Sequence, residues 1–147
     1  MRTITALLIL LMLIIATPVY AEEFIYAHIE SNVLTIKPEN NSSAKAFVDL
    51  LRKSDLTVEM HDYGNFEKVG SIGSSLPRND KSITTKPGDV ILYQGNQITI
   101  YYDVNSWNFT KLGEVQGIEP SELKAILGDG NVSVRFSLTC YRRDNIS

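Results

Sequence analysis

The segment Val90 to Asp103, VILYQGNQITIYYD, decides the fold class of this chain. Its two halves, Val90 to Tyr93 and Gln97 to Asp103, are rich in β-branched and aromatic residues, which favour strands. The QGN tripeptide between them contains a Gly-Asn pair, which readily adopts the positive φ angles that a tight hairpin needs. We therefore predict an antiparallel β-hairpin over this segment.

Strand patterns continue outward from this hairpin in both directions. Leu56, Val58 and Met60 alternate with polar residues, which is typical of a strand with one face in water. The segment from Val132 to Leu138 alternates in the same way. In contrast, Asn105 to Thr110 is interpreted as a polar and aromatic segment outside the strands. The other predicted strands are Phe24 to Glu30, Val33 to Lys37, Phe66 to Val69, Ile83 to Thr85 and Lys111 to Val115.

Two helices are predicted, one on each side of the central hairpin. From Ser43 to Lys53, apolar residues recur at helical spacing, and the preceding Asn and Ser residues are candidate N-caps. The second helix spans Glu119 to Leu127, with Pro120 in the first turn and Gly128 just past the end.

This set of elements predicts a mainly β protein. Three strands alternate apolar and polar residues, which indicates a sheet with one covered face rather than a parallel sheet with two. In a chain this short, a small closed eight-stranded β-barrel, its ends plugged by two short helices, buries those faces and leaves no free edges. The Gly-rich and Pro-rich connection from Asp62 to Gly88 is long, and long connections are usually functional.

The central part of the chain resembles a known family. The stretch His61 to Val115, HDYGNFEKVGSIGSSLPRNDKSITTKPGDVILYQGNQITIYYDVNSWNFTKLGEV, is similar to the cyclophilin-like domain family of bacteria and archaea. Its most recognisable pieces are Tyr63 to Lys68, Lys86 to Asp89 and Thr110 to Gly113. The resemblance spans Val33 to Leu138 and implies a closed eight-stranded barrel with two helices. It does not imply an activity.

The N-terminal segment indicates where the protein is located, and the net charge indicates which partners are disfavoured. Residues 1–21 read as a signal peptide, because a positive residue precedes a short apolar stretch and a small residue, Ala21, ends it. The predicted mature chain then has an N-terminal strand (22–32), a cyclophilin-like domain (33–139) and a C-terminal tail (140–147). We expect an exported protein, periplasmic or extracellular, with no membrane attachment after cleavage. Without Arg2, which lies in the signal peptide, the predicted mature chain has 13 basic side chains against 17 acidic ones, a net charge of -4, which disfavours nucleic acid as a partner.

Aromatic residues interleaved with polar ones suggest a ligand site. An apolar cleft with a few hydrogen-bonding groups is the usual composition of a small-molecule or peptide site. We predict that the site lies at one mouth of the barrel and binds a small ligand or an extended peptide. The alternative for these rings is that they fill the core. The predicted site residues are Tyr63, Glu67, Asn79, Tyr102 and Trp107.

Two other functions stay open from the sequence. One is a diverged peptidyl-prolyl isomerase, although the Phe-His-Arg and Phe-Met-x-Gln-Gly-Gly-Asp strings of true cyclophilins do not occur here. For that activity only Arg78 lies where a cleft is expected. The other is a structural or partner-binding domain without a pocket. No cofactor or metal is expected, because nucleotide-binding motifs are missing and the chain has only two His and one Cys, Cys140, which we interpret as half-buried.

Overall fold

The structure is a computed structural model that describes residues 23–141. The predicted signal peptide (1–21) and the last six residues of the predicted tail (142–147) lie outside the described residues. The described part contains nine strands and two helices. In chain order they are β1 (Ile25–Ile29), β2 (Asn32–Pro38), α2 (Ser42–Lys53), β3 (Leu56–Tyr63), β4 (Glu67–Ser71), β5 (Lys81–Thr84), β6 (Asp89–Tyr93), β7 (Gln97–Tyr101), β8 (Ser106–Val115), α3 (Pro120–Leu127) and β9 (Val132–Ser137).

Eight of the strands form a closed antiparallel barrel, as predicted. The strands pair in the order β2-β1-β9-β3-β4-β7-β6-β8, and a further pairing of β2 with β8 closes the ring. The ninth strand, β5, lies outside the ring and pairs with β8 alone. The predicted fold class, a mainly β barrel with two short helices, is thus confirmed, with one strand in addition.

Every second residue of the wall points into one main core. In β7, Ile98 and Ile100 are completely buried there, and Val90 and Leu92 of β6 face them. The residues between them point to the outside of the barrel, because successive strand residues alternate between the two faces. The wall therefore has a mainly apolar inner face, and its outer face has a different composition.

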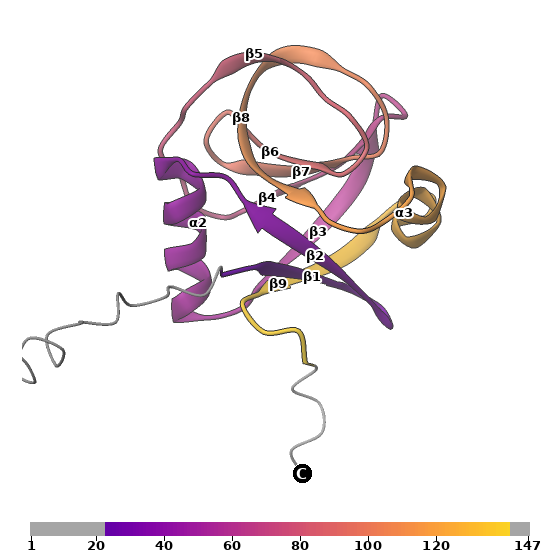
Figure 1. Ribbon diagram of the computed structural model, residues 1–147, viewed down its shortest axis with the longest axis horizontal. Coiled ribbons are helices and arrows are strands. Elements are labelled where there is room, and N and C mark those ends of the chain that lie inside the picture. Colours follow the sequence, from indigo (N-terminus) through magenta and orange to yellow (C-terminus); the bar gives the residue numbers. More distant parts are fainter. Residues whose placement is uncertain (1–22, 142–147) are drawn as a thin grey trace, which may run out of the picture.

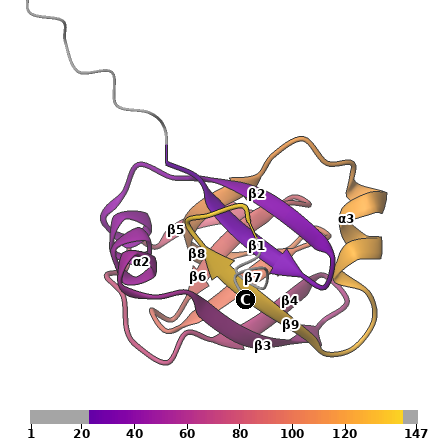
Figure 2. The ribbon, with the colours of Figure 1, turned by 90° about the horizontal axis from the view of Figure 1, so that it is seen from below.

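The two helices lie on opposite sides of the barrel, as Figures 1 and 2 both show. Helix α2 packs Phe47 and Leu51 into the main core, and the Phe47 ring meets Phe136 of β9 edge to face at 5.7 Å. Helix α3 contributes Leu123 and Leu127 to the same core. These contacts agree with the prediction that the helices cover the ends of the barrel.

The seam where β8 meets β2 requires a glycine. Gly113 lies opposite Pro38, and a Cβ atom built on it would come within 2.5 Å of the carbonyl oxygen of Lys37. A real Cβ atom essentially never approaches backbone so closely. The missing side chain lets the two strands approach closely enough to close the ring.

The largest difference from the sequence prediction concerns the start of β8. Asn105 to Thr110 was expected to lie outside the strands, but from Ser106 onward it belongs to the ten-residue strand β8. Its partner is β5, and the register joins Ile83 to Trp107. The pattern is polar because Ser106, Trp107 and Asn108 are all exposed in this arm, the part of β8 that pairs with β5. β8 joins the barrel at Thr110, which pairs with Leu92 of β6, and a register shift follows between Val90 and Ile91 of β6. The half-buried position predicted for Cys140 is also wrong, since Cys140 is exposed.

Candidate functional site

A second apolar cluster lies on the outer face of the barrel wall. Its buried members are Ile91 of β6, Tyr101 of β7 and Phe109 of β8. Ile91 and Tyr101 face outward because the neighbouring Val90, Leu92 and Ile100 face the main core. The partly buried Phe66, Ile83 and Tyr93 pack around this outer cluster.

A pocket of about 570 Å³ opens over this cluster. The barrel wall forms its floor through β3, β4, β6 and β7, and the part of β8 that pairs with β5 contributes Trp107 and Phe109. Figure 1 shows β5 and this part of β8 beyond β6 and β7, on the side away from β1 and β9. The pocket thus lies outside the wall and not at a barrel mouth, where we expected it. Its lining residues are His61, Tyr63, Phe66, Glu67, Val69, Tyr93, Gln97, Tyr101, Asn105, Trp107 and Phe109.

Five of the aromatic rings form one continuous chain along the pocket. Phe66 stacks almost parallel on Tyr101 at 6.0 Å between ring centroids, and Tyr101 meets Phe109 at 5.6 Å. Tyr63 extends the chain at one end by an edge contact with Phe66, and Tyr93 extends it at the other by an edge contact with Phe109. These mutual contacts fix the ring orientations, so the pocket has a preformed aromatic surface.

Glu67 is the only carboxylate in this lining. It begins β4, lies opposite Tyr101 of β7 and is only 7% exposed. Burial raises the pKa of the Glu67 carboxyl, while a hydrogen bond from the Tyr101 hydroxyl and the charge of His61 act in the opposite direction. Burial also raises the pKa of the Tyr101 hydroxyl, so this group stays a neutral donor. The pocket thus combines an apolar surface with a single acidic group.

Three of the five predicted site residues come together in this pocket. Tyr63 and Trp107 are 62% and 63% exposed, and Glu67 lies in the same lining. Asn79 lies elsewhere, because its side-chain amide donates to the hydroxyls of Ser42 and Ser43 at the start of α2, each at 2.8 Å. Asn79 therefore ties the long irregular connection to the helix.

Tyr102 also lies outside the pocket, because it points to the opposite face of the wall from Tyr101. Its ring packs against the main core, and its hydroxyl donates to Asp62 at 3.0 Å. Burial and Asp62 raise the pKa of Tyr102 to about 12. Asp62 in turn forms an ion pair of 2.7 Å with Lys68, which is completely buried. Glu67 and Lys68 are therefore two buried groups on opposite faces of β4.

Several pocket residues were missing from the predicted set. Tyr101 carried a usable signal, because it follows Ile100 and must face away from the core that Ile98 and Ile100 enter. Phe66 and Asn105 carried none, because Phe66 lies in the β3–β4 turn and not in the predicted strand, and Asn105 lies in the β7–β8 connection. Their presence in the lining follows from the way that the β3–β4 turn and the β7–β8 connection fold over the outer face.

Arg78, which the isomerase alternative requires, does not line the pocket. Its guanidinium pairs with Asp80 at 2.6 Å, and its stem lies beside Gly95 of the β6–β7 turn. No arginine or lysine is among the lining residues. Residues 23–141 contain no group of three or more His, Cys, Asp or Glu side chains placed to hold a metal ion.

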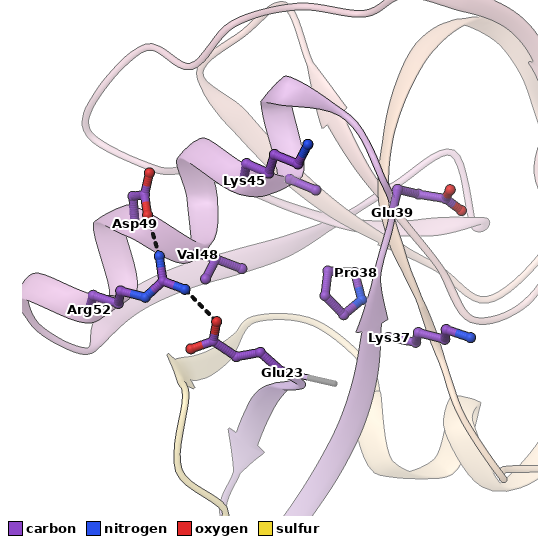
Figure 3. A pocket seen from close by; sticks show the side chains of 9 residues that line it. Glu23, Lys37, Pro38, Glu39, Lys45, Val48, Asp49 and Arg52 are labelled. Atoms are coloured by element: carbon purple, nitrogen blue, oxygen red, sulfur yellow. Dashed lines mark hydrogen bonds and ion pairs between the residues drawn. The ribbon is translucent and has the colours of Figure 1, made fainter. Parts of the chain in front are cut away.

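A second concavity of about 440 Å³ lies between α2 and the end of β2 (Figure 3). Its walls carry both charge signs: Arg52 of α2 pairs with Asp49 and with Glu23, each at 2.5 Å. Lys37, Glu39 and Lys45 also line it. The opposite charges largely cancel, and no aromatic ring is present among the lining residues, so the groove offers a ligand less specific contact than the aromatic pocket.

Comparison with known proteins places the chain in a family. The structure is similar to the solution structure of a hypothetical protein from Archaeoglobus fulgidus, with a TM-score of 0.58 and 14% sequence identity, covering 84% of this chain and 100% of that one. At this identity the likeness shows a shared fold. No curated protein matches the sequence. The model of the cyclophilin-like family matches residues 27–137, which include all eight barrel strands in whole or in part, and the chain therefore belongs to the cyclophilin-like family.

Proposed function

We propose that this protein is an exported binding protein that holds a small organic ligand in the aromatic pocket on the outer face of its barrel. The observation that carries the proposal is the exposure of Tyr63 and Trp107, each more than 60%, at the rim of a concave aromatic surface. Exposed apolar surface costs about 25 cal/mol per Å² relative to burial, and contiguous exposed aromatic surface usually marks a binding site.

The size and composition of the pocket support a small ligand. Small-molecule sites commonly enclose about 300 to 1,000 Å³, a range that includes the 570 Å³ found here. Six aromatic side chains provide the contact area, and Glu67, His61, Gln97 and Asn105 provide polar groups that can orient a ligand. The ring contacts hold most of this surface in place, which limits the entropy that binding costs.

An extended peptide is the second candidate, favoured by the position of β5. This strand is the end of the sheet order, so one of its edges pairs with no other described strand. A peptide that adds to this edge would gain backbone hydrogen bonds there. Ile83 of β5 lies opposite Trp107, so side chains of such a peptide would lie near the rim of the pocket.

The isomerase alternative has no comparable support. Prolyl isomerisation is favoured by a cationic donor that stabilises the twisted amide, and the lining contains no arginine. Arg78 is paired with Asp80 away from the rings. We therefore propose binding and not prolyl isomerisation as the function of the pocket.

The proposal is tested with a fragment screen read through Trp107, which is the only tryptophan of the chain. A ligand in the pocket should change the Trp107 fluorescence and raise the melting temperature, and Tyr63→Ala should weaken its affinity about tenfold or more. The matched control is Tyr141→Ala, because Tyr141 is 79% exposed and does not line the pocket. A ligand whose affinity is the same in Tyr63→Ala and in the control would show that the pocket is not the binding site.

Export is tested separately, by expressing the full chain in a bacterium and measuring the mass of the product. Removal of the first 21 residues and recovery outside the cytoplasm are the expected results. An intact N-terminus on a protein that stays in the cytoplasm would contradict the proposed location.

A further inference from the structure

Glu67 is a buried acid without a basic partner. It is 7% exposed, and none of the ion pairs found in residues 23–141 includes it. The other two charged side chains in the buried class, Lys68 and Asp89, each have an oppositely charged partner within 3.0 Å. The Tyr101 hydroxyl donates to Glu67, but a buried carboxylate in no ion pair is costly, so its presence at a pocket calls for a functional explanation.

The surroundings of Glu67 favour a positive charge. The facing Tyr101 and the stacked Phe66 present aromatic surface to the same pocket, and the faces of aromatic rings attract cations. The lining contains no lysine or arginine that would repel a cation or neutralise the carboxylate. His61, which lies on the neighbouring strand and is exposed, is the only basic side chain in the lining.

Other classes of ligand fit this arrangement less well. An anion would meet the Glu67 carboxylate without a fixed cation to balance it. A metal ion would lack ligands, since the described residues hold no cluster of three suitable side chains. A neutral ligand would leave the carboxylate buried with the Tyr101 hydroxyl as donor but without an ion pair.

We propose that the pocket selects ligands that carry an organic ammonium group on an apolar stem, with the cation placed between Glu67 and the rings of Tyr101 and Phe66. This inference rests on the proposed function, since it names the ligand class of the same pocket. A free amine and the side chain of a lysine in a peptide share this chemistry. The raised pKa of Glu67 agrees with the inference, because a bound cation would stabilise the ionised carboxylate that burial disfavours.

The experiment compares probes that have nearly the same shape and differ in charge. Choline is compared with 3,3-dimethylbutan-1-ol, which replaces the ammonium nitrogen by carbon. Nα-acetyl-lysine methylamide, which keeps its side-chain ammonium, is compared with Nα-acetyl-norleucine methylamide. Affinities are measured by Trp107 fluorescence and by NMR chemical-shift changes on the unaltered full chain. We expect each cation that binds to do so at least tenfold more tightly than its neutral counterpart, and the better of the two cations identifies the source of the ammonium group.

Two variants locate the preference. Glu67→Gln removes the charge in the pocket, and Glu122→Gln removes the same charge from an exposed position on α3. The preference for the cation should fall at least tenfold in Glu67→Gln and stay unchanged in Glu122→Gln. Because the comparison of the paired probes on the unaltered chain does not depend on any variant, misfolding of Glu67→Gln would not obscure the result.

The outcomes separate this inference from the proposed function. If neutral or anionic aromatic fragments bind in the pocket as tightly as the cations, the inference is wrong and the proposed binding function stands. Equal loss of the preference in both variants would also overturn it, because the effect would then come from overall charge. If no probe or fragment of any charge binds in the pocket, both proposals fail.

Discussion

The ion pair between Lys68 and Asp62 allows a sharp prediction, because its two partners differ in burial. Lys68 is completely buried, whereas the Asp62 side chain is 32% exposed. The Lys68 ammonium also donates to the carbonyl of Gly130, whose own amide donates to Asp62 at 2.8 Å. The pair thus connects β3 and β4 to the loop after α3. Removing the acid leaves a buried cation, but removing the cation leaves an acid in contact with water.

The expected costs follow from this asymmetry. Asp62→Asn should lower the free energy of unfolding by about 3 kcal/mol or more, because it leaves the Lys68 charge buried with neutral acceptors only. Lys68→Met replaces the buried charge with an apolar chain of similar length. Asp62 then keeps the Tyr102 hydroxyl and the Gly130 amide, so the cost should be about 1 to 2 kcal/mol. The double variant should resemble Lys68→Met and not the sum of the two changes.

The assay is urea unfolding at pH 7, followed by circular dichroism and by Trp107 fluorescence. A difference of about 1 to 2 kcal/mol between the single variants is well resolved in a domain of this size, whose total stability is about 5 to 15 kcal/mol. A Lys68→Met variant that is as unstable as Asp62→Asn, or less stable, would refute the reasoning. So would strictly additive effects in the double variant.

Three further predictions concern the seam, the outer cluster and the response to acid. Gly113→Val should destabilise the fold by more than about 2 kcal/mol, because its side chain would collide with the backbone of β2, and a melting temperature equal to that of the parent protein would contradict the seam geometry. Phe109→Ala should cost about 2 to 4 kcal/mol and Trp107→Ala less than about 1 kcal/mol, since Phe109 is buried and Trp107 is exposed; equal costs in urea unfolding would show that the arm packs differently. Lys111 and Lys86 lower the pKa of Glu114 to about 2, so its contribution is present above its ordinary pKa of 4.5 and is lost as the pH falls toward 2. The free energy of unfolding should therefore fall less on acidification in Glu114→Gln than in the parent protein. The difference should be only about 1 kcal/mol, because solvent screens the Glu114 side chain, and parallel curves for the two proteins would contradict the pairing.

Because the pocket lies on the outer wall, its residues can change during evolution without disturbing the main core. Residues of the outer cluster are separated from the main core by the strand backbone, so they can change without opening the barrel. The ring contacts among Phe66, Tyr101 and Phe109 stabilise the arm as well as the pocket. Substitutions at the rim, at Tyr63 and Trp107, should therefore alter affinity at little cost to stability.

The sequence alone determined most of the secondary structure and the fold class, because local spacing and composition carry this information. Alternation along β3, β7 and β9 and helical spacing in α2 gave the correct elements, and the number of half-covered strands favoured a closed barrel. The same alternation indicates that Tyr102 faces the core and that Tyr101 faces outward. Composition also identified the aromatic region of the chain, and with it Tyr63, Glu67 and Trp107.

Only the tertiary structure decided which of these residues share a surface. Asn79 lies in the irregular connection, and its direction is set by hydrogen bonds to serines 36 and 37 positions away. The first half of β8 became a strand because β5 pairs with it, and this pairing brings Trp107 and Phe109 over a wall formed by β3, β4, β6 and β7. Such contacts depend on long-range packing and strand register, which local periodicity does not encode, and for this physical reason the pocket was found on the outer wall and not at the mouth of the barrel.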